Sequence, residues 1–447
     1  MSLPRDSFYS FILNIMLTLT NVFLSIVIIR TLGSSGRGIY SVVNSLVAIF
    51  TIALNMGLPW SNTYYTSKYK QRVPFIFVNS LYYSLLILSF AFVVLSLFHH
   101  QIQALLNKQL PEQYLTMLIF LIFAVSLTQM LNSIILGLGK VIFYNQLNFL
   151  VYFIFFIISI GLVAINEYTC QSMVAALLAA YIVVIIISSR KILKYYKIKA
   201  DFKYKYLFQN IREIGLKAQF INFLGALLQR IDILIINYYF GVSLVGYYSI
   251  SIFFAQLVYQ IPGILGNVIF PLSTNDNLLE NTLNKIIKLF HFLIFLNIIL
   301  YFFLLIAGNF IITLLYGNDY TLSFRTFLVL YPGFTCSSLG IILSSFLAGR
   351  GYPSVLFKAS ITAIALNIIL NLTLIPSLNI IGAAISCCIS YFAMLLILCL
   401  HMSSNYDIKI ISFFKMSSDE YIKFFEYFKS LLMSKKSMIK AGGIYEK

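Results

Sequence analysis

The chain has 447 residues, of which 60% are hydrophobic and only 10% are charged, and its formal net charge is +17. This composition excludes an ordinary soluble domain, in which about a quarter of the residues are charged because the surface faces water. The basic excess does not indicate a nucleic-acid-binding protein, since the basic residues lie between long apolar runs, as in the cytoplasmic loops of membrane proteins. The five cysteines lack CxxC spacing, so we expect neither a disulfide nor a metal site.

The apolar runs, taken in chain order, predict twelve membrane-spanning helices and an all-α integral membrane protein. A bilayer core of about 30 Å requires about 20 apolar residues in each helix. The first run, Phe8–Ile29, is long and has no small-residue cleavage site, so we expect a retained helix and not a signal peptide. The expected spans are centred near residues 19, 48, 86, 126, 153, 180, 228, 257, 302, 336, 364 and 391.

The distribution of basic residues predicts the orientation of these helices. With the N-terminus inside, 26 of the 31 Lys and Arg fall on the cytoplasmic side. Four fall outside, namely Arg30, Arg37, Lys108 and Arg325, and Arg230 falls within a span. Because cytoplasmic loops are enriched in Lys and Arg, we expect both termini in the cytoplasm.

An internal repeat predicts how the helices are grouped. Residues 33–41 (GSSGRGIYS) are echoed at residues 241–249 (GVSLVGYYS), with five identities at an offset of 208. Two parallel units imply two six-helix bundles with a substrate path between them. The expected organisation is an N-terminal bundle over 1–192, a basic cytoplasmic linker over 193–212, a C-terminal bundle over 213–402 and a cytoplasmic tail over 403–447. The tail carries an apolar stripe at helical spacing from residue 421 to 432, which predicts an amphipathic helix on the inner leaflet.

The motif after the first span carries a resemblance to a known family. Residues 30–40 (RTLGSSGRGIY) resemble the R-x-LG-x-x-x-x-G-x-Y signature of Wzx-type O-antigen and polysaccharide-unit flippases, which belong to the multidrug/oligosaccharidyl-lipid/polysaccharide exporter superfamily. Similar segments follow in the same order over residues 5–400: 57–59 (GLP), 137–140 (GLGK), 230–232 (RID), 246–249 (GYYS), 315–317 (LYG), 371–376 (NLTLIP) and 382–384 (GAA).

The resemblance implies a function that needs no catalytic residue and no cofactor. The substrate would be an O-antigen or capsule repeat unit on undecaprenyl pyrophosphate. Alternating access would move it from the cytoplasmic to the periplasmic leaflet of the bacterial inner membrane. Membrane lipids and other polysaccharide-assembly proteins are the expected partners. Twelve expected spans, against the fourteen usual in peptidoglycan-precursor flippases, argue against lipid II as the substrate.

Arginines are the candidates for binding the pyrophosphate, because the planar guanidinium matches phosphate oxygens. Arg230 leads, since it lies about 20 Å inside the seventh expected span. Arg30, Arg325 and Arg37 are the further candidates. A structural role stays open for each: pairing with another helix for Arg230, an interfacial anchor for Arg30, a capping charge for Arg325 and an ordinary loop charge for Arg37.

Asp232 is the one acidic residue within an expected span and the candidate for coupling transport to a proton or sodium ion. A structural pairing with Arg30 or Arg325 is the alternative. Lys140 and Arg350 occupy equivalent inner loops of the two repeats and are candidates for a cytoplasmic gate, although the positive-inside rule already accounts for them.

Two other functions compete with a flippase. A multidrug antiporter of the same superfamily would share the fold, but its cationic substrates require an acidic cavity, whereas arginines outnumber Asp232 here. An enzyme of polysaccharide assembly would need paired carboxylates or a catalytic histidine in a sizeable external loop. The external acidic residues are far apart, the loops are short and the four histidines show no ligand spacing, so we expect no enzymatic activity.

Overall fold

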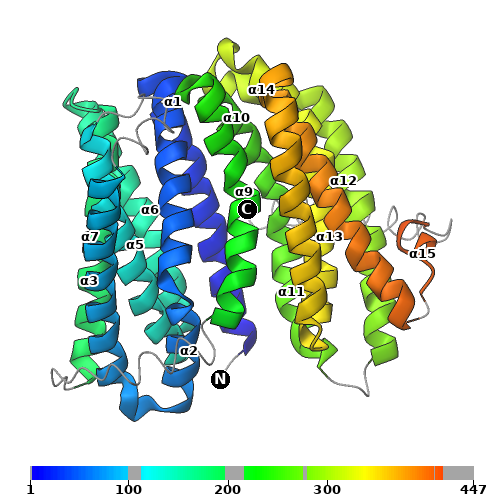
Figure 1. Ribbon diagram of the computed structural model, residues 1–447, viewed down its shortest axis with the longest axis horizontal. Coiled ribbons are helices and arrows are strands. Elements are labelled where there is room, and N and C mark those ends of the chain that lie inside the picture. Colours follow the sequence, from blue (N-terminus) through cyan, green and yellow to red (C-terminus); the bar gives the residue numbers. More distant parts are fainter. Residues whose placement is uncertain (1–2, 99–111, 197–215, 275–278, 407, 416–447) are drawn as a thin grey trace, which may run out of the picture. The chain divides into compact units, whose positions relative to one another are not determined.

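The computed structural model describes residues 3–98, 112–196, 216–274, 279–406 and 408–415, shown as ribbons in Figure 1. Every regular element within these ranges is a helix, which confirms the predicted all-α fold. Most of the predicted linker 193–212 and the predicted tail helix lie outside the described residues. The chain forms two compact units, and the division of 1–192 and 213–402 into two bundles stays a prediction.

Unit 1 comprises Met1–Phe254, Asn309–Leu330 and Ala363–Cys387. Its complete helices are α1 (Leu3–Asn55), α2 (Leu58–Lys68), the 3₁₀ turn η1 (Lys70–Arg72), α3 (Val73–Leu97), α5 (Glu112–Gly137), α6 (Val141–Ala164), α7 (Cys170–Tyr195), α9 (Leu216–Phe240) and the turn η5 (Asn318–Tyr320). It also contains most of α10 (Val242–Gln256), the end of α12 (Leu279–Tyr316), the start of α13 (Thr321–Gly349) and the middle of α14 (Pro353–Tyr406).

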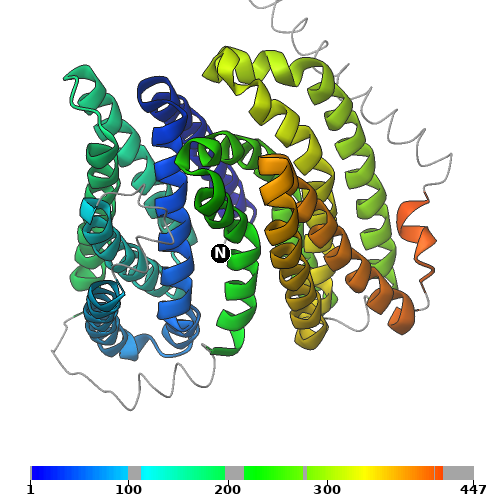
Figure 2. The same ribbon diagram turned by 45° about the horizontal axis from the view of Figure 1, so that its top comes forward.

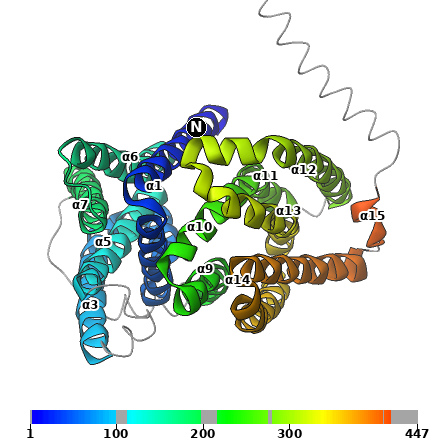
Figure 3. The same cartoon turned by 90° about the horizontal axis from the view of Figure 1, so that it is seen from above.

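Unit 2 comprises Ala255–Gly308, Tyr331–Thr362 and Cys388–Lys447. It contains the turn η3 (Leu257–Tyr259), α11 (Gln260–Ser273), the short α15 (Ile411–Phe414) and the remaining parts of α12, α13 and α14. Its apolar core includes Phe290 on α12, Phe346 on α13 and Leu395 on α14. Figure 3 shows α11, α12 and α13 lying together in this unit.

Ten helices of the described chain are long and apolar enough to cross a membrane. Two of them, α1 and α14, have 53 and 54 residues. At 1.5 Å per residue each would be about 80 Å long, far more than the bilayer core. Each has one break in its backbone, at Gly33 (φ 67°) and at Asn379 (φ 54°), residue types that enter the left-handed region most readily. Crossing once on each side of these breaks is compatible with the predicted twelve spans, a number that remains a prediction.

Helix α5 is the most enclosed span of unit 1. The most apolar 18 residues of this span are 83% buried, and the helix packs against α1, α2, α3, α6 and α7. Figure 3 shows it among α1, α3, α6 and α7. Helix α9 packs against α1, and both Figure 1 and Figure 2 show the two running side by side. A group of helices around α5 and a contact between α1 and α9–α10 therefore frame the candidate sites.

The two copies of the repeated motif meet each other within unit 1. A methyl group on Gly38 would overlap the carbonyl of Val242, and a methyl group on Gly246 would overlap the carbonyl of Ser34. At an offset of 208, Gly38 corresponds to Gly246 and Ser34 to Val242, so the contact is reciprocal. Both copies also begin with a glycine of positive φ, 67° at Gly33 and 83° at Gly241. Local structure therefore matches between the motifs, while the repeat of whole bundles stays a prediction.

Candidate functional site

Arg37 is a buried cation at the crossing of α1 and α10. Its side chain is 8% exposed, and its Nε–H donates to the Ser249 hydroxyl at 3.2 Å. The guanidinium carbon lies 5.4 Å from the ring centre of Tyr40 and 6.0 Å from that of Phe253. Cations over aromatic faces are stabilised by the ring quadrupole, which offsets part of the cost of burial. The glycine contacts of Gly38 and Gly246 bring the two helices close enough for this arrangement.

The sequence interpretation of Arg37 as an ordinary loop charge was wrong. The helix resumes directly after the break at Gly33, so Arg37 lies within α1 and not in an external loop. The segment is rich in Gly and Ser, residues typical of loops, and this composition concealed the helix. Close packing against α10 explains the glycines in physical terms.

Arg30 holds the end of another helix in unit 1. Its Nε–H donates to the Leu315 carbonyl at 3.1 Å and its NH2 group donates to the Leu314 carbonyl at 2.9 Å. These carbonyls belong to the last turn of α12, which has no intrahelical partner for them and carries the negative end of the helix dipole. Arg30 therefore ties α1 to α12, although its side chain is largely exposed.

Arg30, Arg37 and Arg230 are connected through electrostatic interactions with one another or with a shared tyrosine. Arg230 on α9 lies within electrostatic range of Arg37 and also of Asp232. Tyr320 lies within range of both Arg37 and Arg30. Among the described residues, no hydrogen bond or ion pair engages the half-buried Arg230 guanidinium. We call Arg30, Arg37 and Arg230 the arginine cluster; the like charges of Arg37 and Arg230 repel each other, and a bound anion would relieve this repulsion.

The other predicted basic residues lie apart from this cluster. Arg325 is exposed in the first turn of α13, and nothing described connects it to the three arginines. Lys140 precedes α6 in unit 1 and is half-buried. Arg350 lies in unit 2, where its NH1 group donates to the Ser273 carbonyl at 3.4 Å. The gate role proposed for Lys140 and Arg350 stays a prediction.

Asp232 is held by neutral groups. The carboxylate is 1% exposed and accepts hydrogen bonds from the Tyr248 hydroxyl, from the Ile233 backbone N–H at 2.8 Å and from the Cys387 thiol at 3.5 Å. It therefore connects α9 to α10 and α14, and neither Arg30 nor Arg325 is its hydrogen-bonding partner. The carboxylate has Arg230 within electrostatic range but no hydrogen bond to it.

Buried amides of α14 extend the surroundings of Asp232. Asn367 donates to the Cys387 sulfur at 3.7 Å and accepts from Asn371 at 2.9 Å. The Oδ1 atom of Asn371 is buried without a hydrogen-bond partner in the described structure. The Asp232 carboxylate and the uncommitted Asn371 oxygen are the oxygen ligands that hard cations prefer.

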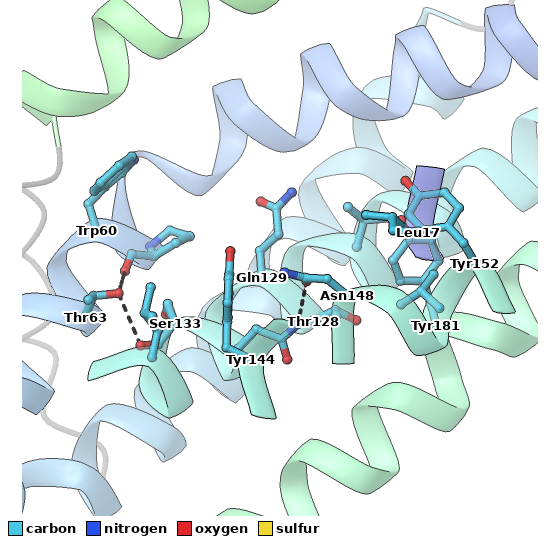
Figure 4. A pocket seen from close by; sticks show the side chains of 15 residues that line it. Leu17, Trp60, Thr63, Thr128, Gln129, Ser133, Tyr144, Asn148, Tyr152 and Tyr181 are labelled. Atoms are coloured by element: carbon cyan, nitrogen blue, oxygen red, sulfur yellow. Dashed lines mark hydrogen bonds between the residues drawn. The ribbon is translucent and has the colours of Figure 1, made fainter. Parts of the chain in front are cut away.

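A pocket of about 530 Å³ opens among α1, α2, α5, α6 and α7 of unit 1 (Figure 4). Of the fifteen described residues that line it, none carries a formal charge. Trp60 stands at one end and Tyr152 and Tyr181 at the other, with Gln129 and Asn148 between them. A pocket of this size with a few polar groups among aromatic side chains is typical of small-molecule sites.

The amides of this pocket are anchored at one end. Gln129 accepts a hydrogen bond from Asn55 at 2.9 Å. Asn148 accepts one from Asn132 at 3.3 Å, and Asn132 in turn accepts from Ser188 at 3.2 Å. The amide nitrogens of Gln129 and Asn148 donate to nothing in the described parts of the chain. These amide nitrogens are therefore held in position by the bonds of their oxygens and line the pocket without a described partner.

This pocket could not be predicted from the sequence. Its residues come from five helices, and no single segment shows more than one or two of them. Trp60, the single tryptophan of the chain, directly follows the GLP motif and was the available signal. Its side chain is 55% exposed.

Comparison with protein families gives one match over most of the chain. The family model described as "Polysaccharide biosynthesis protein" matches residues 27–325. The chain is also 26% identical over 109 residues to the probable low-salt glycan biosynthesis flippase Agl15 of Haloferax volcanii. That alignment covers 24% of this chain and 23% of the relative, so the chain matches less than a quarter of that protein's length.

Solved structures with the same fold cover nearly the whole chain. The lipid II flippase MurJ in an inward closed conformation matches with a TM-score of 0.72 and 17% identity, over 95% of this chain and 92% of that one. An inward-facing multidrug resistance MATE transporter of the MOP superfamily matches with a TM-score of 0.65 and 14% identity, over 90% and 96%. These likenesses show that the chain has the fold of these multi-pass membrane transporters.

Proposed function

Since the chain belongs to the polysaccharide biosynthesis protein family, we propose that it is a flippase for lipid-linked oligosaccharide. The substrate is an O-antigen or capsule repeat unit on undecaprenyl pyrophosphate. The protein carries it from the cytoplasmic to the periplasmic leaflet of the bacterial inner membrane, with both of its termini in the cytoplasm. The observation that supports this proposal best is the arginine cluster.

The arginine cluster fits the charged part of that substrate. A guanidinium presents donors in a planar fork that matches phosphate oxygens, and hydrogen bonds between charged groups are about twice as strong as neutral ones. Arg230 has no hydrogen-bond partner among the described residues, so its donors are available to an anion. Arg37 donates a hydrogen bond to Ser249, and Arg30 donates to the carbonyls at the end of α12. Arg230 is therefore the direct phosphate ligand in this proposal. Arg37 and Arg30 add positive electrostatic potential and fix the positions of the helices.

The same geometry argues against a multidrug antiporter. A cationic substrate requires acidic groups along its path, whereas Asp232 is enclosed by Tyr248, Cys387 and a backbone N–H. The charge-free pocket also contains no carboxylate. Both candidate regions of unit 1 are therefore unsuited to a cation as the main cargo.

The membrane potential favours export of an anion. Moving one elementary charge through 100 mV is worth about 2.3 kcal/mol, and an interior-negative potential drives a pyrophosphate outward. Asp232 adds ion coupling in this proposal: a proton or sodium ion binds at the carboxylate as the outward-open state resets. The uncommitted Asn371 oxygen nearby supports a role for a cation there.

Opening on the outer side requires contacts to separate in unit 1. The positive-inside rule assigns Arg30, Arg37 and the end of α12 to the outer half of the membrane. There the Gly38–Gly246 crossing and the bonds of Arg30 to Leu314 and Leu315 close the structure. Alternating access breaks these contacts when the substrate leaves.

Deletion of the gene in its host tests the proposal. We expect loss of surface polysaccharide and accumulation of complete lipid-linked repeat units in the inner membrane. Unchanged surface polysaccharide together with increased sensitivity to cationic drugs would contradict the proposal and support the antiporter instead.

A further inference from the structure

The charge-free pocket has features that the arginine cluster lacks. It offers oriented amide ends, a tyrosine hydroxyl from Tyr144 and aromatic faces, and its lining is without charge. It lies among the helices around α5, and none of the residues predicted from the sequence to bind pyrophosphate lines it. We propose that this pocket binds uncharged sugar residues of the transported glycan, an inference that rests on the proposed flippase function.

The chemistry of a sugar matches the two kinds of lining. A pyranose ring has hydroxyls around its edge and apolar C–H faces. Tryptophan and tyrosine combine a large apolar face with one polar group, so they can cover such a face. The free amide nitrogens of Gln129 and Asn148 can donate to the hydroxyl or carbonyl oxygens of a sugar.

The anchoring of the amides makes the donors directional. Asn148 is held through Asn132 to Ser188, and Gln129 is held by Asn55, so helices α1, α5, α6 and α7 together fix the two side chains. Oriented donors lose little conformational entropy on binding. Such preorganisation would be an unexplained cost if the pocket held nothing, because polar groups at membrane depth are expensive.

Two other occupants fit the lining less well. A lipid chain would leave the amide donors of Gln129 and Asn148 unsatisfied, which costs free energy in an apolar environment. A cationic drug would find no carboxylate among the lining residues. Of these three occupants, a sugar is the one that satisfies both the donors and the aromatic faces.

The single tryptophan allows a direct test, because all tryptophan emission of the protein comes from Trp60. Purified full-length protein in lipid nanodiscs is titrated with the lipid-free oligosaccharide repeat unit released from the host's own polysaccharide. We expect a saturable change in Trp60 emission. Inorganic pyrophosphate and sugar-free undecaprenyl phosphate should leave the emission unchanged.

Two pocket variants separate binding from folding. Asn148→Ala should weaken binding of the repeat unit about fivefold to tenfold, which corresponds to the loss of one to two hydrogen bonds. Tyr144→Phe removes one hydroxyl at nearly constant shape and should weaken binding about twofold to fivefold. Asn284→Ala, an exposed amide on α12 that does not line the pocket, is the matched control and should bind normally.

Failure of the sugar site can be told apart from failure of the proposed flippase function. Three outcomes would overturn the sugar site. The first is no saturable response of Trp60 emission to the repeat unit, and the second is a response to sugar-free undecaprenyl phosphate instead. The third is equal affinity for the repeat unit in Asn148→Ala, Tyr144→Phe and Asn284→Ala. Deletion would still cause lipid-linked repeat units to accumulate if the protein is a flippase without this site. If the flippase proposal itself fails, that accumulation is absent whatever Trp60 reports.

Discussion

The arginine cluster and the charge-free pocket differ in almost every physical property. The cluster consists of three arginines, of which Arg30 and Arg37 are hydrogen-bonded and Arg230 has no described hydrogen-bond partner. The pocket contains no charge and exposes oriented amides between aromatic side chains. A substrate with an anionic end and a neutral, hydroxyl-rich body needs both kinds of surface. The difference therefore predicts that changes in the cluster abolish transport, whereas changes in the pocket reduce it.

Removing the Arg230 guanidinium should reduce export more than any of the other changes. Arg230→Ala should abolish surface polysaccharide without loss of membrane-inserted protein, because Arg230 is the cluster residue whose guanidinium has no described hydrogen bond. Arg230→Lys should retain part of the export, since it keeps the charge and loses the planar fork. Surface polysaccharide and protein level are measured together for each variant. Normal export by Arg230→Ala at normal protein level would exclude the residue from the mechanism, and loss of both would favour a structural role.

Locking the crossing of α1 and α10 should also block transport, but reversibly. The Ser34 and Ser243 hydroxyls lie 3.0 Å apart. A Ser34→Cys/Ser243→Cys double variant, built in a chain whose five native cysteines are replaced, should form a disulfide on oxidation and lose export. Reductant should restore export. Each single variant under the same oxidant is the control, and export by the fully oxidised double variant would show that this contact stays closed throughout the cycle.

Changing the pocket should weaken export without abolishing it. Asn148→Ala should lower the rate at which surface polysaccharide reappears after induction about fivefold to tenfold, in line with the hydrogen bonds lost. The Asn284→Ala variant should match the wild type. A complete block of export by Asn148→Ala at normal protein level would contradict this prediction. The pocket would then be as essential for export as the arginine cluster.

Neutralising Asp232 should alter the dependence of transport on ions more than its extent. Asp232→Asn keeps the shape of the side chain and removes the charge at the proposed coupling site. Export by this variant should lose its response to external pH or to sodium, measured over a matched series of buffers. An unchanged response would exclude Asp232 from coupling.

Arg325→Ala should have the smallest effect of these changes. The side chain is exposed in the first turn of α13 and is not linked to the arginine cluster by any described contact. We expect near-normal surface polysaccharide. A loss comparable to that of Arg230→Ala would extend the cluster to α13.

The sequence predicted the helical fold because apolar runs of sufficient length have few alternatives in a bilayer. It also placed the boundary between the first two expected spans around Gly33, where α1 has its backbone break, and it placed Arg230 within a helix, which is α9. It misplaced Arg37, because the helix around this residue is stabilised by packing of Gly38 against α10, about 200 residues away. It missed the pocket for the same reason: Trp60, Gln129 and Tyr152 come together only when five helices pack.

Transport by the purified protein tests the central claim most directly. Vesicles that contain the protein and lipid-linked repeat units in both leaflets are treated with a membrane-impermeant reagent that modifies the glycan. We predict that wild-type protein makes the protected inner pool accessible, and that Arg230→Ala protein leaves it protected, as in protein-free vesicles. A pool that stays protected in the presence of folded wild-type protein under an imposed membrane potential, over both pH and sodium gradients, would contradict the account.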